Sequence, residues 1–163
     1  MTQKNPRPAP TYSIGEIGRM TATKTATIRY YEQIGLLAAS ARTDGNQRRY
    51  DNAARERLAF VRHARALGFT LDAIRDLLSL SDHPDQSCDQ ADAIARAQLA
   101  AVDQRLDHLR RLRDELRRMI EMCRGGQVED CRVIQTLGDH SLCLNESHEA
   151  DEAVRRGDRQ VRM

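Results

Sequence analysis

The segment SIGEIGRMTATKTATIRYYEQIGLL, Ser13–Leu37, predicts two short helices joined by a tight turn. Ser13 and Glu16 have the spacing of a capping box, in which each side chain accepts a hydrogen bond from the other residue's backbone N–H. A first helix is expected over about 14–20 and a second over about 23–33, each ended by turn residues. Two short helices connected this closely are typical of a helix-turn-helix.

The segment that follows, residues 38–50, predicts a β-hairpin. Asp44, Gly45 and Asn46 tolerate the positive φ values of a tight turn. Arginines flank this turn, and arginine and tyrosine side chains can both donate to phosphate oxygens. A hairpin edged in this way beside a helix-turn-helix indicates a wing, with Arg42, Arg48, Arg49 and Tyr50 as its polar edge.

Charge and aromatic residues are unevenly distributed over the 163 residues. The net charge is only +2, but residues 1–65 contain twelve Lys or Arg and five Asp or Glu, whereas residues 83–163 contain thirteen and sixteen. All six aromatic residues lie within the first 69 positions. A compact basic module followed by a more elongated part suits binding to a polyanion.

Several functional classes are not expected. The sequence contains no apolar stretch near the roughly 18 residues of a membrane span, and residues 1–11 are not the apolar core of a signal peptide. We therefore expect a cytoplasmic protein without membrane contact, whose four cysteines are free thiols, metal ligands or redox groups and not a disulfide scaffold. We find no Ser/His/Asp set, phosphate-binding glycine loop or paired carboxylates of an enzyme.

Residues 88–122 contain neither glycine nor proline, and their apolar residues recur at intervals of mostly three and four. This pattern predicts one amphipathic helix of about 35 residues and roughly 50 Å. Its apolar stripe needs a partner helix, and the same helix of a second copy, antiparallel or parallel, is the simplest one. We therefore expect a homodimer.

Three of the four cysteines flank this helix. Cys88 precedes it, Cys123 ends it and Cys131 follows within a glycine-containing loop. Two thiolates from one short loop suit a soft metal ion, and Cys88 of an antiparallel partner would supply a third. His140, Cys143 and His148 are a possible auxiliary metal site. A disulfide between the two loop cysteines is the main alternative.

The chain resembles the MerR family of metal-responsive transcription regulators, and within it the lead/cadmium/zinc-sensing branch. The resemblance rests on Ile28–Glu32 followed by Ile34–Leu36, on the wing end Arg48–Tyr50, on Leu67–Leu71 and on the cysteines. It implies a dimer on a palindromic operator, with the second helix of each helix-turn-helix in the major groove. Expected DNA contacts are Ser13, Thr25, Arg29, Tyr30, Tyr31, Arg48, Arg49, Tyr50 and Arg65, although Tyr30 is equally suited to the core.

The resemblance also implies a mechanism. Such regulators act with RNA polymerase at a promoter, and metal binding bends and untwists the DNA to realign the promoter elements. Three thiolates favour a divalent soft ion, with lead and cadmium first and zinc next, and with mercury or Cu(I) less favoured. A Cu(I)/Ag(I) sensor of the same family and a thiol-redox regulator remain alternatives. Lys24 departs from the family, which usually has a capping residue there, so Thr23 is expected to cap the second helix.

The sequence thus predicts a mainly α fold with a winged helix-turn-helix DNA-binding domain, a long antiparallel coiled-coil dimerisation helix and a C-terminal metal-binding loop. The expected boundaries are a disordered arm at 1–11, the DNA-binding domain at 12–82, the dimerisation helix at 83–122, the loop with a short helix at 123–143, and a disordered tail at 144–163.

Overall fold

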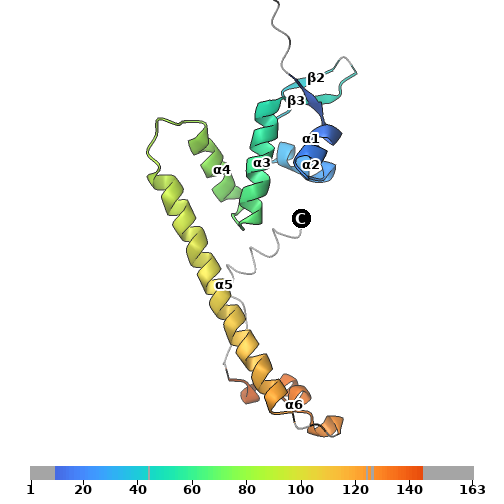
Figure 1. The fold of residues 1–163 in the computed structure, drawn as a ribbon, viewed down its shortest axis with the longest axis vertical. Helices are drawn as coiled ribbons and strands as arrows, with labels where there is room; N and C mark the ends of the chain where they lie inside the picture. Colours follow the sequence, from blue (N-terminus) through green and yellow to red (C-terminus); the bar gives the residue numbers. More distant parts are fainter. Residues whose placement is uncertain (1–9, 44, 124, 126, 145–163) are drawn as a thin grey trace, which may run out of the picture. The chain divides into compact units, whose positions relative to one another are not determined.

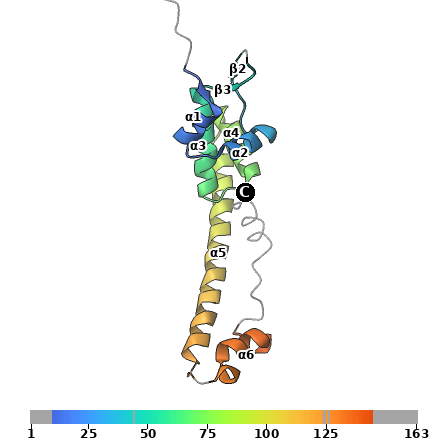
Figure 2. The same ribbon diagram turned by 90° about the vertical axis from the view of Figure 1, so that its right-hand side faces the viewer.

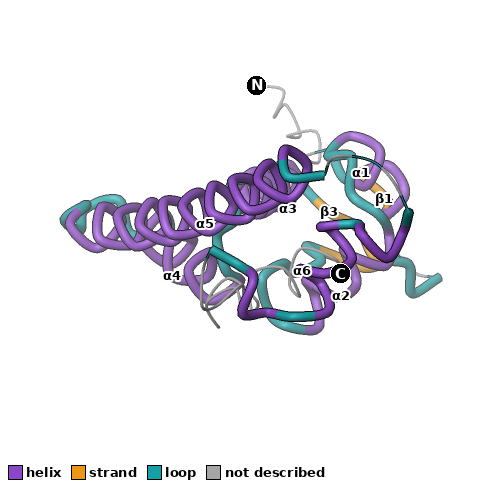
Figure 3. The backbone as a smooth tube through the Cα atoms, turned by 90° about the horizontal axis from the view of Figure 1, so that it is seen from below, coloured by secondary structure: helices purple, strands orange, loops and turns teal. Residues whose placement is uncertain are grey.

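A computed structural model of the chain describes residues 10–43, 45–123, 125 and 127–144. The fold is mainly helical, with three short strands in the described part (Figures 1 and 3). The described residues divide into two compact units, with the boundary between Ala91 and Asp92. None of the helices among these residues combines the length and the apolar character needed to span a membrane.

The first unit has the element order of a winged helix-turn-helix, as predicted. After a two-residue strand come two short helices, then a hairpin, then two longer helices. Their bounds are β1 Tyr12–Ser13, α1 Ile14–Met20, α2 Thr25–Gln33, β2 Ala41–Arg42, β3 Arg48–Tyr50, α3 Asn52–Ala66 and α4 Leu71–Ser81.

Side-chain caps start three of these four helices. The Ser13–Glu16 capping box is present at α1, as predicted, with the backbone N–H of Ser13 donating to Glu16 Oε2 at 2.7 Å. Asp51 caps α3 and Thr70 caps α4. The exception is α2, whose N-cap residue, Lys24, makes no side-chain cap hydrogen bond.

The prediction that Thr23 caps α2 is wrong. Its hydroxyl donates to the backbone oxygen of Thr21 at 3.2 Å, within the turn that joins α1 to α2. The turn is tight: a Cβ at Gly18 would lie 2.8 Å from the backbone oxygen of Thr23. Ala22, in the same turn, has a φ of 49°, which L-residues rarely adopt. The hydroxyl of Thr23 is therefore part of the turn that fixes the angle between the two helices.

The predicted wing is present as strands β2 and β3, and a third strand joins it. The sheet order is β1-β3-β2 and both pairings are antiparallel, with Tyr12 opposite Tyr50 and Ala41 opposite Arg49. The turn residue Asn46 has a φ of 59°, in agreement with the hairpin prediction. Strand β1 was not predicted, because a strand of two residues carries no alternation of apolar and polar side chains.

The core of the first unit is aliphatic around one buried tyrosine. Its fully buried side chains come from α1, α2, the wing, α3 and α4, so one cluster fixes all the helices of the DNA-binding module. Burying each large aliphatic side chain stabilises the fold by roughly 1.5–3 kcal/mol. The largest of these residues are Tyr50, Ile17, Ile28, Leu36, Leu58 and Ile74.

The second unit contains most of the predicted long helix, α5 (Asp89–Glu121), whose bounds differ by one residue at each end from the prediction. After the loop come η1 (Val128–Asp130), α6 (Arg132–Gly138) and η2 (His140–Leu142). Both side views show α6 beside the C-terminal end of α5 (Figures 1 and 2). The short predicted helix of the loop region is therefore present.

Candidate DNA interface and metal centre

The cations of the DNA-binding module fall into two groups according to their partners. Among the described residues of the helix-turn-helix, Arg19, Lys24 and Arg29 have neither a hydrogen bond nor an ion pair, and all three side chains are exposed. Arg19 lies at the end of α1, Lys24 before α2, and Arg29 within α2. The exposed cations of the helix-turn-helix are thus available for an external anion.

The other predicted arginine contacts have protein partners. Arg48 Nε lies 3.0 Å from Glu32 Oε2, and Arg49 Nη2 donates to the backbone oxygen of Thr11 at 2.7 Å. Arg65 Nη1 donates to the backbone oxygen of Phe69 at 2.8 Å. The side chain of Arg48 is 42% exposed despite its ion pair. A DNA contact by these three arginines stays a prediction.

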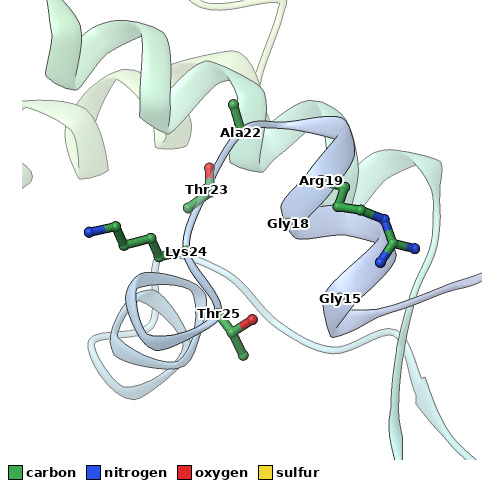
Figure 4. Close-up of a pocket in the computed structure, with 7 residues that line it drawn as sticks. All are labelled: Gly15, Gly18, Arg19, Ala22, Thr23, Lys24 and Thr25. Carbon is green, nitrogen blue, oxygen red and sulfur yellow. The ribbon is translucent and has the colours of Figure 1, made fainter.

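The groove between α1 and α2 contains a pocket of about 300 Å³. Figure 4 shows Arg19 on α1, and Lys24 and Thr25 at the start of α2. Thr25 was predicted as a DNA contact and is exposed at this rim. Arg19 and Lys24 were not predicted as DNA contacts, and Lys24 was expected only to be an unusual residue at a helix cap position. Together they give this pocket two positive charges.

The structure corrects one predicted DNA contact, Tyr50. Its side chain is fully buried, and its hydroxyl donates to Glu32 Oε1 at 2.9 Å. Burial, followed by this hydrogen bond to a carboxylate, raises the pKa of Tyr50 above the ordinary tyrosine value. A buried hydroxyl bonded to Glu32 is not available to a phosphate, so the prediction is wrong and Tyr50 is a core residue.

The two adjacent tyrosines of α2 differ in exposure. Tyr31 is 7% exposed, and burial raises the pKa of its hydroxyl. Tyr30 is 37% exposed, and its ring centroid lies 6.0 Å from that of Tyr31. Of the two, Tyr30 is therefore the more accessible to an external partner, whereas Tyr31 contributes mainly to the core. Ser13, also predicted as a contact, uses its oxygen to cap α1.

In the second unit, the structure brings two of the predicted metal ligands together. Cys123 follows α5 and is exposed, and Cys131 precedes α6 and is half-buried. The backbone N–H of Ile134 at the start of α6 lowers the pKa of Cys131, and the neighbouring N–H of Val133 and the thiol of Cys123 act in the same direction. A loop that pairs two thiols and favours a thiolate suits a soft cation.

The other predicted ligands are not part of this pair. Cys88 is exposed and lies in the first unit, before α5. Cys143 is half-buried at the end of η2, and its backbone N–H donates to the backbone oxygen of His140 at 3.0 Å. His148 lies outside the described residues. In the described part of a single chain, no three Cys, His, Asp or Glu side chains form a metal-binding group.

A buried ion pair fixes the segment that contains Cys143. Glu115 on α5 is 3% exposed and pairs with Arg118 one turn later. The backbone N–H of Leu144 donates to Glu115 Oε2 at 2.9 Å, and Arg118 donates to the backbone oxygen of Leu142. The two residues that flank Cys143 are therefore both bonded to α5. This anchor was not predicted, because the i,i+3 spacing of Glu115 and Arg118 is also that of an exposed ion pair on a helix.

Comparisons with known proteins agree with this architecture. The family described as "MerR HTH family regulatory protein" matches residues 12–81, and the one described as "MerR, DNA binding" matches residues 55–119. The HTH-type transcriptional regulator ZntR of Escherichia coli (strain K12) is 37% identical over 129 residues, covering 77% of this chain and 92% of ZntR. The HTH-type transcriptional regulator CueR of Yersinia pestis is 32% identical, covering 77% of this chain and 90% of CueR.

A solved structure is also similar to the chain. The transcription regulator PbrR691 from Ralstonia metallidurans CH34, in complex with lead(II), has 37% sequence identity and a TM-score of 0.68, with 77% of this chain and 98% of that chain covered. Together, the two family matches cover residues 12–119, which contain the helix-turn-helix, the wing and most of α5. The chain belongs to the MerR family of helix-turn-helix regulatory proteins.

Proposed function

We propose that this protein is a metal-sensing transcription regulator that binds operator DNA as a homodimer and activates its promoter when a divalent soft metal binds. The observation that carries this proposal is the pairing of Cys123 and Cys131 at the end of α5, in a chain whose first unit is a winged helix-turn-helix. ZntR and the lead(II) complex of PbrR691, both 37% identical, support a response to this class of metal.

The DNA-binding step uses the exposed cations of the first unit. Arg29 on α2 and the pair Arg19 and Lys24 beside the pocket face duplex DNA, with α2 in the major groove and Arg48 of the wing on a flanking phosphate. A dimer places two such modules on a palindromic site. Arginine contacts to phosphate give affinity that falls with salt.

The metal step uses thiolates from two chains. Cys123 and Cys131 bind the ion from one protomer, and Cys88 of the second protomer completes the set, because lead, cadmium and zinc generally bind more than two protein ligands. Lead and cadmium suit three thiolates, and zinc suits four ligands, for which Cys143 or His140 is a further donor. Metal binding then distorts the operator DNA so that RNA polymerase can use the promoter.

The same thiol pair favours two other candidate functions. Two thiols that face each other in one chain suit linear binding of Cu(I) or Ag(I), as a copper or silver sensor of this family would require. They also suit a disulfide, which would make the protein a redox-responsive regulator. Neither alternative uses Cys88, and this residue therefore separates them from the proposal.

The test is a metal titration of four single variants. Cadmium is added to the wild type and to Cys88→Ser, Cys123→Ser, Cys131→Ser and Cys143→Ser, and the ultraviolet absorbance of cadmium–thiolate bonds is recorded. We expect a large loss in the first three variants and none for Cys143→Ser, while operator affinity without metal is unchanged in all four. Full absorbance in Cys88→Ser would contradict the shared site, and a promoter response to Cu(I) that persists in Cys88→Ser would favour the copper alternative.

A further inference from the structure

The exposed apolar stripe of α5 is interrupted at one position. Its residues occur at alternating intervals of three and four, the spacing of the a and d positions of a coiled coil. In a single chain these side chains are between 40% and 67% exposed. Arg113 occupies the a position at which the next apolar residue is due. The stripe residues are Leu99, Val102, Leu106, Leu109, Leu116 and Ile120.

We propose that Arg113 sets the register of the dimer by pairing with Asp103 of a second copy, so that the two α5 helices associate about an axis between Asp107 and His108. This inference rests on the proposed homodimer and adds its register and the residues that select it. In this register the apolar layers are Leu99 on Leu116 and Leu106 on Leu109. Arg113 lies level with Val102 of the second copy.

The flanking charges support this register over its neighbours. The e position beside Val102 is Asp103, displaced along the axis from Arg113 of the other copy by about 1.5 Å, the rise of one residue. A shift of one heptad in one direction would put Arg113 level with Ala95, beside Arg96. A shift in the other direction would put it level with Leu109, beside Arg110. Both shifted registers thus place like charges together, which is unfavourable.

The ion pair that Arg113 makes within its own chain does not prevent it from pairing with Asp103 of a second copy. Its guanidinium lies 2.8 Å from the carboxylate of the adjacent residue, Asp114, and the two side chains are 56% and 55% exposed. Exposed pairs of this kind contribute little stability. A polar residue at an a position commonly fixes register at some cost in stability, and Arg113 fits this role.

The proposed metal ligands agree with the same register. With the axis between Asp107 and His108, the start of α5 in one copy, next to Cys88, lies within about 8 Å along the axis of the end of α5 in the other copy, where the Cys123–Cys131 loop begins. The layers of the apolar stripe and the proposed shared thiolate site are therefore consistent with one axis. A shift of one heptad would move Cys88 by about 10 Å relative to the loop, given a rise of 1.5 Å per residue.

Disulfide cross-linking tests the register in the full-length chain with its four cysteines replaced by serine. Leu99→Cys combined with Leu116→Cys should give a covalent dimer under mild oxidation. Leu99→Cys with Leu109→Cys, and Leu106→Cys with Leu116→Cys, represent the shifted registers and should not. Adding Arg113→Leu should allow cross-links in the shifted pairs. Efficient cross-linking of a shifted pair while Arg113 is present would overturn the proposal.

A charge exchange in the otherwise native chain provides a second test. By sedimentation equilibrium, Arg113→Asp and Asp103→Arg should each raise the dimer Kd at least about tenfold, because each puts like charges together. The double variant Arg113→Asp, Asp103→Arg should restore the dimer Kd to within about threefold of the wild-type value, since the ion pair is re-formed with its charges reversed. Arg111→Asp, an exposed arginine off the stripe, is the matched control and should leave it unchanged. An unchanged Kd in both single variants would contradict the pairing.

These results are distinguishable from failure of the proposed function. If the dimer forms and responds to metal but cross-links in another register, only the role of Arg113 is lost. If no dimer forms at any concentration that binds the operator, the proposed shared metal site is lost with it.

Discussion

Replacement of Tyr50 by phenylalanine should lower the stability of the protein without weakening its binding to DNA. The ring stays in the core, and the substitution removes only the hydroxyl, which donates to Glu32 Oε1 at 2.9 Å. Glu32 keeps its ion pair with Arg48 but loses one of its two side-chain partners. Because the acceptor is a carboxylate whose side chain is only 13% exposed, the lost hydrogen bond should cost roughly 1–2 kcal/mol.

The assay is urea unfolding at a fixed protein concentration, together with operator binding at one salt concentration. For a module of this size, the loss corresponds to a fall in Tm of roughly 5–10 °C. Tyr12→Phe is the matched control, since its hydroxyl also donates at 2.9 Å, to Asn52, but at an exposed site. An unchanged stability combined with weaker operator binding would refute this reasoning and place Tyr50 on the DNA.

The pH dependence of stability gives a second readout for the same variant. Burial holds the pKa of Tyr50 above its ordinary value, so the hydroxyl ionises more readily in the unfolded chain than in the folded one. Its contribution is therefore complete below the unfolded pKa of about 10 and is lost as the pH rises beyond it. Wild-type stability should decline above that pH, and Tyr50→Phe should decline less steeply.

Three further outcomes are expected. Arg29→Ala should weaken operator binding and reduce the slope of log affinity against log salt by about 1, in a titration of binding against salt, and an unchanged slope would exclude a phosphate contact. Gly18→Ala should destabilise the fold by roughly 1–3 kcal/mol in urea unfolding, because its Cβ would lie 2.8 Å from the backbone oxygen of Thr23. A variant as stable as the wild type would show that the backbone of the turn can move to accept the methyl group. Asp51→Ala should cost about 1 kcal/mol at neutral pH. The N–H of Ala54 lowers the pKa of Asp51 in the folded protein. The stability contributed by the Asp51 carboxylate is therefore present above the unfolded pKa and is lost as the pH falls through the lower folded pKa. An acid titration in which the stability of Asp51→Ala declines as steeply as that of the wild type would contradict this cap.

The helices were predictable because their signals are local. Capping residues, glycine at helix ends and the long run without glycine or proline lie within single elements, and the observed bounds differ from the predicted ones by a few residues at most. The wing was predictable for the same reason, from the turn residues around Asn46, which has a positive φ in the structure. These features depend on neighbouring residues and need no knowledge of tertiary contacts.

Tertiary contacts decided the features that the sequence did not reveal. Tyr50 and Arg48 lie in the same short strand and both contact Glu32, but only Tyr50 is buried in the core, which the sequence spacing cannot show. Glu115 has the spacing of a surface ion pair with Arg118, yet it is buried because the backbone of Leu144 folds back onto it. In both cases a residue far away in the sequence sets the role of the side chain.

The most direct test of the central claim, a metal site shared between two chains, is complementation between variants. Cys88→Ser and Cys123→Ser homodimers should each lack a complete thiolate set. A mixed dimer should regain one of its two sites, so an equal, freely exchanging mixture should recover about one quarter of the wild-type cadmium–thiolate absorbance. Recovery near this level supports the shared site. No recovery in a mixture shown to contain mixed dimers, or full absorbance in the Cys88→Ser homodimer, would contradict it.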